Sequence, residues 1–363
     1  MSIAFDPERM EQVKQIYARW WDGSLDRPLI AIRSQERKRS DGGFTLSQAT
    51  CADFSVSAKE VVEGMEQELN SYTYYGDAYP LLNLDAFGPG VAAAFCGARL
   101  DNSSGSVWFY PPEHTPPIDE LHITYDPNNQ WVRRIKDICE AGYERWRGSV
   151  VIGFPDLGGA MDILATFRTS EQLLYDLYDY PDEVKRLVGE IHAAWHEAFR
   201  DMAGVLQPNG VFTDWNGILS EVPNQMLQSD FSYMISDDMF REFALEEIRA
   251  SAKRMGRANY HLDGVGCLSF LDDILSIDEI HMVQWVPGDG QPTGLHWMDI
   301  YRRIRESGKC TQVIGAFADL EAVVKELGSG AGVYYNIYYN TTAVSAETLR
   351  QSALFTDIFG EDF

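Results

Sequence analysis

From about residue 149 onward, the chain alternates short apolar runs with amphipathic stretches, a pattern typical of a mostly parallel α/β fold. Each run is short and largely apolar, as expected for strands that are covered on both faces. The runs predict strands at residues 150–154, 211–214, 258–262, 281–286, 311–317 and 332–337. Apolar residues spaced three and four apart from Val184 to Met202 predict a helix that begins at Pro181. A second helix is predicted over residues 237–255, with Ser236 as its N-cap and Gly256 as its stop.

Residues 1–148 are less regular, with a helical opening to Trp21, a candidate strand at 29–33 and a helix near 57–69. No linker separates the two parts, and no repeat of fixed period is visible. We therefore predict one α/β domain over residues 1–363, a TIM-type (β/α)8 barrel with an elaborated N-terminal segment. In this prediction, residues 1–148 form that elaboration plus the first elements, and residues 149–363 form the regular β/α repeats. Trp108, Trp131 and Trp146 are assigned to the core.

A doubly wound open sheet is the competing architecture. We consider it the weaker alternative because no GxGxxG or GxxxxGK[ST] loop follows any of the predicted strands. The nearest approach, which begins at Gly153, lacks the lysine.

The charge balance excludes two classes of partner. With 55 Asp and Glu against 30 Lys and Arg, the formal net charge is −25, which repels both nucleic-acid phosphates and anionic membrane surfaces. The longest apolar run, around residues 91–96, is far shorter than the ~20 residues that span a bilayer. The first 21 residues contain no continuous apolar stretch of the kind found in secretory signals, so we expect a cytoplasmic protein. The five cysteines form no CxxC pair, which argues against a disulfide framework or a zinc knuckle.

In a parallel barrel, catalytic groups gather at the C-terminal ends of the strands. Polar and aromatic residues at the ends of the predicted strands are therefore the candidates for a functional site. They are Asp77, Tyr79, Asp214, Trp215, His261, Asp263, Gln284, Trp285, Asn336 and Tyr338.

The pair His261-x-Asp263 has two interpretations. Residues two apart on a strand point to the same face, so the imidazole and the carboxylate could converge on one ligand, proton or metal ion. Alternatively, Asp263 caps the next helix and His261 bonds a neighbouring carbonyl. A catalytic zinc usually has three protein ligands, and here only His261 together with Asp214 or Asp263 could supply them.

Four cations, Arg33, Arg37, Lys38 and Arg39, stand within seven residues of an otherwise acidic chain. They form either a solvated basic loop or a clamp for carboxylates or phosphates, to which arginine is well suited.

Several segments resemble the uroporphyrinogen decarboxylase superfamily, which includes the decarboxylase of haem biosynthesis and the corrinoid-dependent methyltransferases. The segments are RPLIAIRSQER, GDAYPLLNLDAFGPG, VIGFPDLGGAMDILATF, DMFREF, YHLDG and MVQWVPGDG, in that order. The resemblance covers residues 27–340 and implies a TIM-type barrel. It also implies that Arg33 and Arg37 bind substrate carboxylates and that Asp77 stabilises a protonated pyrrole ring. The family's active-site tyrosine is replaced by Phe167, and its C-terminal histidine has no counterpart.

In the methyltransferase branch of this superfamily, an H-x-C pair and a later cysteine hold a zinc ion that activates a thiol. The present chain has His261-x-Asp263 instead and no cysteine on its last predicted strand. The resemblance therefore implies, at most, a zinc site richer in oxygen ligands.

Our first functional hypothesis is decarboxylation of a tetrapyrrole-like or other carboxylate-bearing small molecule, which requires no cofactor. Arg33 and Arg37 would bind carboxylates, Asp77 would stabilise positive charge, and a floor for proton transfer would be formed by Asp214, His261 and Asp263. The alternative is corrinoid-dependent methyl transfer with a partner corrinoid protein and a zinc ion. We also consider a homodimer for either enzyme.

Two further hypotheses belong to other classes. A glycoside hydrolase would place two carboxyls about 5–10 Å apart around a sugar stacked on Trp215 or Trp285. A binding protein without catalysis would hold a tetrapyrrole or a corrinoid, in keeping with the missing tyrosine and histidine.

Overall fold

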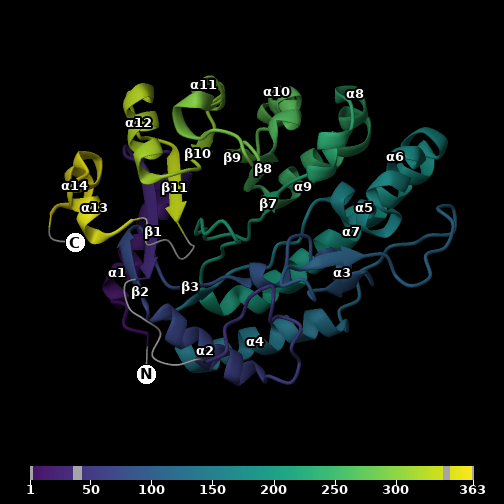
Figure 1. Cartoon of the computed structure of the whole chain (residues 1–363), viewed down its shortest axis with the longest axis horizontal. Helices are drawn as coiled ribbons and strands as arrows, with labels where there is room; N and C mark the ends of the chain where they lie inside the picture. Colours follow the sequence, from purple (N-terminus) through teal and green to yellow (C-terminus); the bar gives the residue numbers. More distant parts are fainter. Residues whose placement is uncertain (1–2, 36–42, 338–343, 362–363) are drawn as a thin grey trace.

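The central element of the fold is a seven-stranded sheet with the order β2-β1-β11-β10-β9-β8-β7 (Figure 1). The computed structural model describes residues 3–35, 43–337 and 344–361. All neighbouring strands of this sheet pair in parallel except β2, which is antiparallel to β1. The strands are β1 (Leu29–Gln35), β2 (Tyr72–Gly76), β7 (Met226–Leu227), β8 (Ala258–Asp263), β9 (Ile280–Val286), β10 (Cys310–Gln312) and β11 (Val333–Ile337). The α/β class with a mostly parallel sheet is therefore confirmed.

Two further pairs of strands lie outside this sheet. They are the parallel pair β3 (Leu81–Leu82) and β6 (Val151–Ile152), and the antiparallel hairpin β4 (Arg99–Asp101) and β5 (Trp108–Tyr110). The predicted strand at residues 211–214 is not formed; it contributes an isolated bridge from Phe212 to Ser220 and a bond from the Phe154 N–H to the Thr213 carbonyl (2.7 Å).

Closure of the strands into a barrel, which the sequence predicts, stays a prediction. In the described residues, strand pairing does not join the large sheet and the β3–β6 pair into one ring. The large sheet ends at β2 and β7, each of which pairs along one edge only among the described strands.

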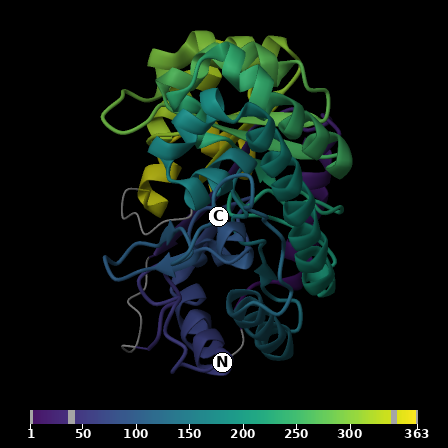
Figure 2. The ribbon, with the colours of Figure 1, turned by 90° about the vertical axis from the view of Figure 1, so that its right-hand side faces the viewer.

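The helices surround the sheets (Figure 1; Figure 2). They are α1 (Pro7–Trp21), α2 (Ala58–Leu69), α3 (Ala92–Phe95), α4 (Gln130–Trp146), α5 (Ala160–Arg168), α6 (Ser170–Asp179), α7 (Pro181–Leu206), α8 (Asp237–Phe240), α9 (Glu246–Met255), α10 (Leu271–Leu275), α11 (Met298–Glu306), α12 (Phe317–Leu327), α13 (Ala346–Arg350) and α14 (Ala353–Phe359). The predicted helix at 237–255 is α8 and α9, joined by a π-helical turn, and Ser236 and Gly256 cap its ends as expected. The predicted strand at 311–317 is only partly correct, because β10 ends at Gln312 and Phe317 already begins α12.

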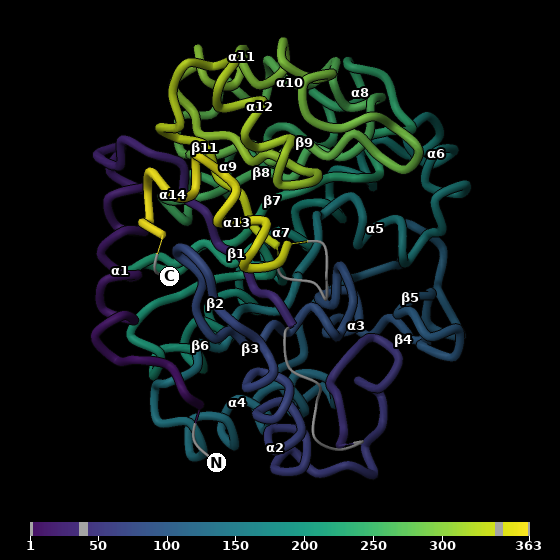
Figure 3. Tube along the Cα trace, turned by 60° about the vertical axis from the view of Figure 1, so that its left-hand side comes forward, coloured from purple at the N-terminus to yellow at the C-terminus, as the bar shows by residue number. Residues whose placement is uncertain are grey.

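Alternation along the strands gives the large sheet two distinct faces. On the inner face, Ala31, Met282 and Tyr334 pack in one apolar cluster with Val13 and Tyr17 of α1, which lies beside β1 and β2 (Figure 3). On the outer face, the neighbouring residues of the same strands join the main core with apolar residues of α9 to α12. The residues of this outer layer include Ile32, Val283, Val333, Ile248, Ile274, Ile304 and Leu320.

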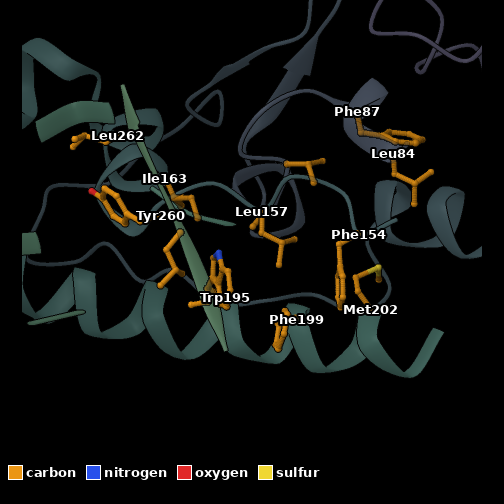
Figure 4. Packing of buried hydrophobic residues seen from close by; sticks show 14 of the residues in the cluster. Leu84, Phe87, Phe154, Leu157, Ile163, Trp195, Phe199, Met202, Tyr260 and Leu262 are labelled. Atoms are coloured by element: carbon orange, nitrogen blue, oxygen red, sulfur yellow. The ribbon is translucent and has the colours of Figure 1, made fainter. Parts of the chain in front are cut away.

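Side chains of helix α7 pack against Phe154 and Leu157 of the loop after β6 (Figure 4). Phe199 stacks on Phe154 with ring centroids 5.1 Å apart, and the Trp195 indole N–H donates to the Gly158 carbonyl at 2.9 Å. The loop after β6 is thereby tied to a helix face that the spacing of apolar residues had predicted.

Two of the three tryptophans assigned to the core are buried, Trp131 and Trp146, but Trp108 is 60% exposed. Its neighbours Val107 and Phe109 point inward from the hairpin, and alternation therefore directs Trp108 outward. Among the described residues, no helix is both long enough and apolar enough to cross a membrane.

The backbone at Gly158 lies close to that at Gly90, and this contact can be tested by substitution. A Cβ on Gly158 would lie 2.5 Å from the Gly90 Cα, and its φ is +76°, so Gly158→Ala should lower the free energy of unfolding by about 2 kcal/mol or more. Gly189, which is exposed within α7 and has open space where a Cβ would lie, is the matched control; Gly189→Ala should raise stability by about 0.5–1 kcal/mol. Urea denaturation measures both changes, and equal effects would contradict this account.

Candidate functional site

Four polar side chains form a row on the inner face, near the C-terminal ends of β8 to β11. His261 of β8 pairs in register with Gln284 of β9, and Gln284 pairs with Gln312 of β10. Asn336 of β11 lies two residues beyond the partner of Gln312. Two residues earlier on the same face, β9, β10 and β11 carry Met282, Cys310 and Tyr334, which belong to the inner apolar cluster or pack against it, whereas β8 carries the buried Asn259. On β9 to β11 the inner face thus changes from apolar to polar close to the strand ends.

These four side chains are linked by a chain of hydrogen bonds whose direction is determined at one end. The Asn336 side-chain NH2 donates to the Asn216 backbone carbonyl at 2.7 Å, and this carbonyl can only accept. The Asn336 side-chain oxygen must then accept from Gln312, at 2.8 Å, and the Gln312 oxygen accepts from Gln284, at 2.8 Å. The Gln284 oxygen is left facing His261 Nδ1, at 2.5 Å. We call this chain of three side-chain amides, Asn336, Gln312 and Gln284, the amide relay.

The amide relay determines the tautomer of His261. Because the Gln284 oxygen is an acceptor, Nδ1 of the imidazole must carry the proton, and Nε2 keeps its lone pair. Burial lowers the pKa of His261 below its ordinary value, so the ring is neutral near pH 7. The indole of Trp215 packs edge-on against the imidazole, with ring centroids 5.5 Å apart.

Two carboxylates converge on His261. One ligand atom from each of Asp230, His261 and Asp263 lies within 4.8 Å of the other two. His261 and Asp263 are half-buried at the end of β8, and Asp230, which begins the short helical turn η3 (Asp230–Met234), is exposed. The surrounding protein and the charge of Asp263 raise the pKa of Asp230 to about 6.

A third carboxylate, Asp162 of α5, holds the segment that carries Asp230. Its two oxygens accept the backbone N–H groups of Phe231 (2.7 Å) and Asp230 (3.2 Å). Burial, together with the charge of Asp230, raises the pKa of Asp162 to about 7. The site is therefore rich in negative charge and binds protons or cations more readily than isolated carboxylates do.

Asp214, a predicted catalytic residue, lies deeper than this cluster. It is 1% exposed, and its oxygens accept the backbone N–H groups of Met226 (2.6 Å) and Asn216 (2.9 Å). It thereby holds the turn that presents the Asn216 carbonyl to the amide relay. Burial raises the pKa of Asp214 to about 6.

Two predicted substrate-binding aromatics are inaccessible. Trp285 is fully buried on the outer face, where it packs against Trp297, because strand alternation directs it away from Gln284. Tyr79 is also fully buried, and its hydroxyl donates to the Gly217 carbonyl at 2.9 Å. Neither ring can stack on a ligand at the strand ends, and both assignments are corrected.

Asp77, predicted to lie at the strand ends and to stabilise positive charge there, does not lie at that edge of the sheet. Both of its oxygens accept from Arg27, at 2.7 and 2.8 Å, and one also accepts from the Ile30 N–H. The physical reason is that β2 runs antiparallel, so the residue after its last position lies beside the beginning of β1 rather than at the C-terminal edge of the sheet.

Of the four basic residues predicted to bind carboxylates, only Arg33 lies in the described part of the chain. Arg33 is buried at the end of β1, where it donates to the Leu81 carbonyl at 3.1 Å and lines a cavity of about 340 Å³ together with Glu68 and Asp85. Arg37 lies outside the described residues, as do Lys38, Arg39 and the predicted ligand-binding residue Tyr338.

Sequence reasoning missed Asp230, Asp162, Gln312 and Asn216. Gln312 could have been found, because it stands on a predicted strand just as Gln284 does. Asp230 and Asp162 carried no such signal: Asp230 follows the two-residue strand β7, and Asp162 lies in the first turn of α5.

Comparison with known proteins identifies the fold but not a family. No protein-family profile matches the chain, and no curated protein matches it in sequence. Among solved structures, a methyltransferase from Methanosarcina mazei is similar, with a TM-score of 0.58 and 10% sequence identity. The match covers 92% of this chain and 94% of that one. At this identity the likeness concerns the fold alone.

The direction of the amide relay can be tested at its middle. Gln312→Leu removes the 2.8 Å bond from the Gln284 NH2 to the Gln312 oxygen and leaves that NH2 only its 3.4 Å contact with the Asn216 side-chain oxygen. Gln284 can then turn its NH2 toward His261. We expect the Nδ1–H fraction of His261 to fall, as measured by nitrogen NMR shifts of histidine-labelled protein. Gln291→Leu, a change of an exposed glutamine outside the relay, is the control. An unchanged His261 tautomer in the Gln312 variant would refute the relay.

The raised pKa of Asp214 implies a pH-dependent stability. Between about pH 4 and pH 6 the folded protein holds the Asp214 proton more tightly than the unfolded chain, so this group's contribution to stability is lost as pH rises. Asp214→Asn stays neutral, and its lost acceptor costs the same at every pH. The stability of the variant relative to the parent should therefore rise by up to about 3 kcal/mol from pH 4 to pH 7. Denaturant titrations at several pH values measure this difference, and a flat difference would contradict the raised pKa.

Proposed function

We propose that the protein is a methyltransferase in which Asp230, His261 and Asp263 hold a divalent cation, zinc, beside the methyl-accepting group. The observation that carries this proposal is the convergence of three ligand atoms, from one imidazole and two carboxylates, within 4.8 Å of one another. The sequence suggests a zinc site at His261 and Asp263, and we propose Asp230, from a different segment of the chain, as the third ligand.

The residues present fit such a cation. Zinc accepts one imidazole nitrogen and carboxylate oxygens, and catalytic zinc sites have three protein ligands and one open position. A metal-binding histidine almost always donates its other ring N–H to a fixed acceptor, as His261 does to Gln284. The exposure of Asp230 leaves the site open to solvent on one side.

The chain's own residues prepare the site. The amide relay keeps the Nε2 lone pair of His261 available, Asp162 holds the backbone of Asp230, and Trp215 limits rotation of the imidazole. A bound zinc ion lowers the pKa of a hydroxyl or thiol that it contacts, which makes that group a better nucleophile near pH 7. A neutral His261 and ionised Asp263 and Asp230 are the protonation states that this arrangement requires.

Two observations favour methyl transfer over decarboxylation. The fold is similar to that of a methyltransferase, and the residue expected to stabilise a decarboxylation intermediate, Asp77, is committed to Arg27. We further propose a methylated corrinoid on a partner protein as the methyl donor, following the resemblance of the sequence segments to the corrinoid-dependent branch. The large sheet and the β3–β6 pair would then be the two parts of a TIM-type barrel whose ring of strand pairing is interrupted at β2 and β7.

Metal binding is the first test of this proposal. The parent protein should bind one zinc ion per chain, and His261→Ala and Asp230→Asn should each weaken zinc binding by at least about tenfold, because each removes one of three ligands. The measurement is calorimetric titration of metal-stripped protein, with circular dichroism to verify folding. His192→Ala removes a different histidine–carboxylate pair, with Glu247, and should leave zinc affinity unchanged.

A second readout addresses the reaction. Zinc-loaded protein should transfer a methyl group from methylcobalamin to a small thiol or alcohol, and His261→Ala should lose this activity. Failure of the parent protein to bind zinc, or equal binding by the His261 variant, would overturn the metal site. Zinc binding without transfer to any acceptor would overturn the methyltransferase assignment alone.

A further inference from the structure

A cavity of about 550 Å³ has Asp230 in its lining, and none of the three amides of the amide relay is among its lining residues. Most of its wall comes from the β4–β5 hairpin, helix α5 and the turn η3, and Gln48, Pro89 and Ser170 complete it. The hairpin belongs to the N-terminal elaboration of the fold and lies near α5 (Figure 3). We call this space the hairpin pocket. Its volume is in the range of sites for small organic ligands.

The lining of the hairpin pocket combines aromatic surface with negative charge. Trp108 and Phe109 contribute from the hairpin, and Phe231 and Met234 contribute from η3. Among the described residues, the ionisable ones that line it are Asp162 and Asp230, and none is a lysine, arginine or histidine. The pocket is therefore suited to a ligand that is both apolar in surface and positive in charge.

Trp108 is an independent sign of a ligand surface. The side chain is 60% exposed, whereas Val107 is buried and Phe109 is half-buried. Burial in the core therefore does not account for an indole at this position, whereas a place in the wall of a cavity does. Indole is the aromatic side chain that attracts organic cations most strongly.

We propose that the hairpin pocket binds the N-alkylated ammonium group of a small organic ligand. The alkyl groups would contact Trp108 and Met234, and the positive charge would face Asp162 and Asp230. An anionic ligand would meet two carboxylates and no compensating cation, and a neutral ligand would leave those carboxylates without a counter-charge.

The position of the pocket relates it to the proposed reaction. Asp230 belongs both to the pocket wall and to the group of three metal-binding side chains. A ligand whose ammonium group occupies the pocket would therefore extend toward His261. Resting on the proposed function, this identifies the methyl acceptor as a molecule that carries an alkylated ammonium group at one end and a hydroxyl or thiol at the other.

The charge preference can be measured with three probes of similar shape. Choline carries a quaternary ammonium, dimethylbutanol is its neutral carbon isostere, and dimethylbutyrate is an anion with the same branched end. Calorimetric titration of metal-stripped protein should show choline binding at least about tenfold more tightly than dimethylbutanol, and dimethylbutyrate more weakly than both. Equal affinity for choline and dimethylbutanol, or preference for the anion, would overturn the proposal.

Substitutions then locate the binding site. Trp108→Ala should weaken choline binding by about tenfold, and because Trp108 is exposed the variant should fold normally. Tyr110→Ala is the matched control, since Tyr110 is an exposed aromatic of the same hairpin that does not line the pocket. Unchanged choline affinity in the Trp108 variant would place any binding elsewhere and refute the hairpin pocket.

The outcome is separable from that of the zinc titration. Choline binding in a protein that fails to bind zinc would leave this proposal standing while the proposed function falls. Zinc binding that depends on His261, without any preference for choline, would sustain the metal site and reject the ammonium pocket.

Discussion

The geometry of the candidate site depends on one backbone carbonyl, that of Asn216. Because a carbonyl can only accept, it orients Asn336, and through Gln312 and Gln284 that orientation reaches His261 on the far strand. Asp214 holds the turn in which this carbonyl lies, through two backbone N–H groups. Asp214, a buried aspartate outside the group of Asp230, His261 and Asp263, thus helps to determine which nitrogen of His261 keeps its lone pair.

The alternation of side chains along each strand explains why a row of polar residues can exist in an otherwise apolar interior. Each of β8, β9 and β11 directs one side chain of a neighbouring pair inward, as at Gln284, and the next outward, as at Trp285. The outward residues pack against the helices and form the apolar core there, so the inward residues near the strand ends can be polar. Their side-chain amides satisfy one another, which avoids the cost of burying unpaired polar groups.

Negative charge is concentrated where chemistry is expected. The net charge of −25 belongs to the whole chain, but Asp162, Asp230 and Asp263 meet beside one imidazole, and the pKa values of the first two are raised. Such a group favours cations, whether protons, a metal ion or an organic ammonium. A substrate with several carboxylates would instead need the basic segment near Arg33, and Arg33 itself lies buried against Leu81.

The sequence by itself determined the α/β class, the positions of β8, β9, β11 and α7, and the place of His261 and Asp263 at the end of one strand, because local periodicity and strand-end position are properties of short segments. It did not determine that β2 would run antiparallel and place Asp77 beside Arg27, or that Trp285 would face outward. Nor could it bring Asp230 next to His261, since they are 31 residues apart and meet only through strand pairing and the bonds from Asp162. Contacts between distant segments depend on how the edges of the sheet are occupied, and only the tertiary structure decides that.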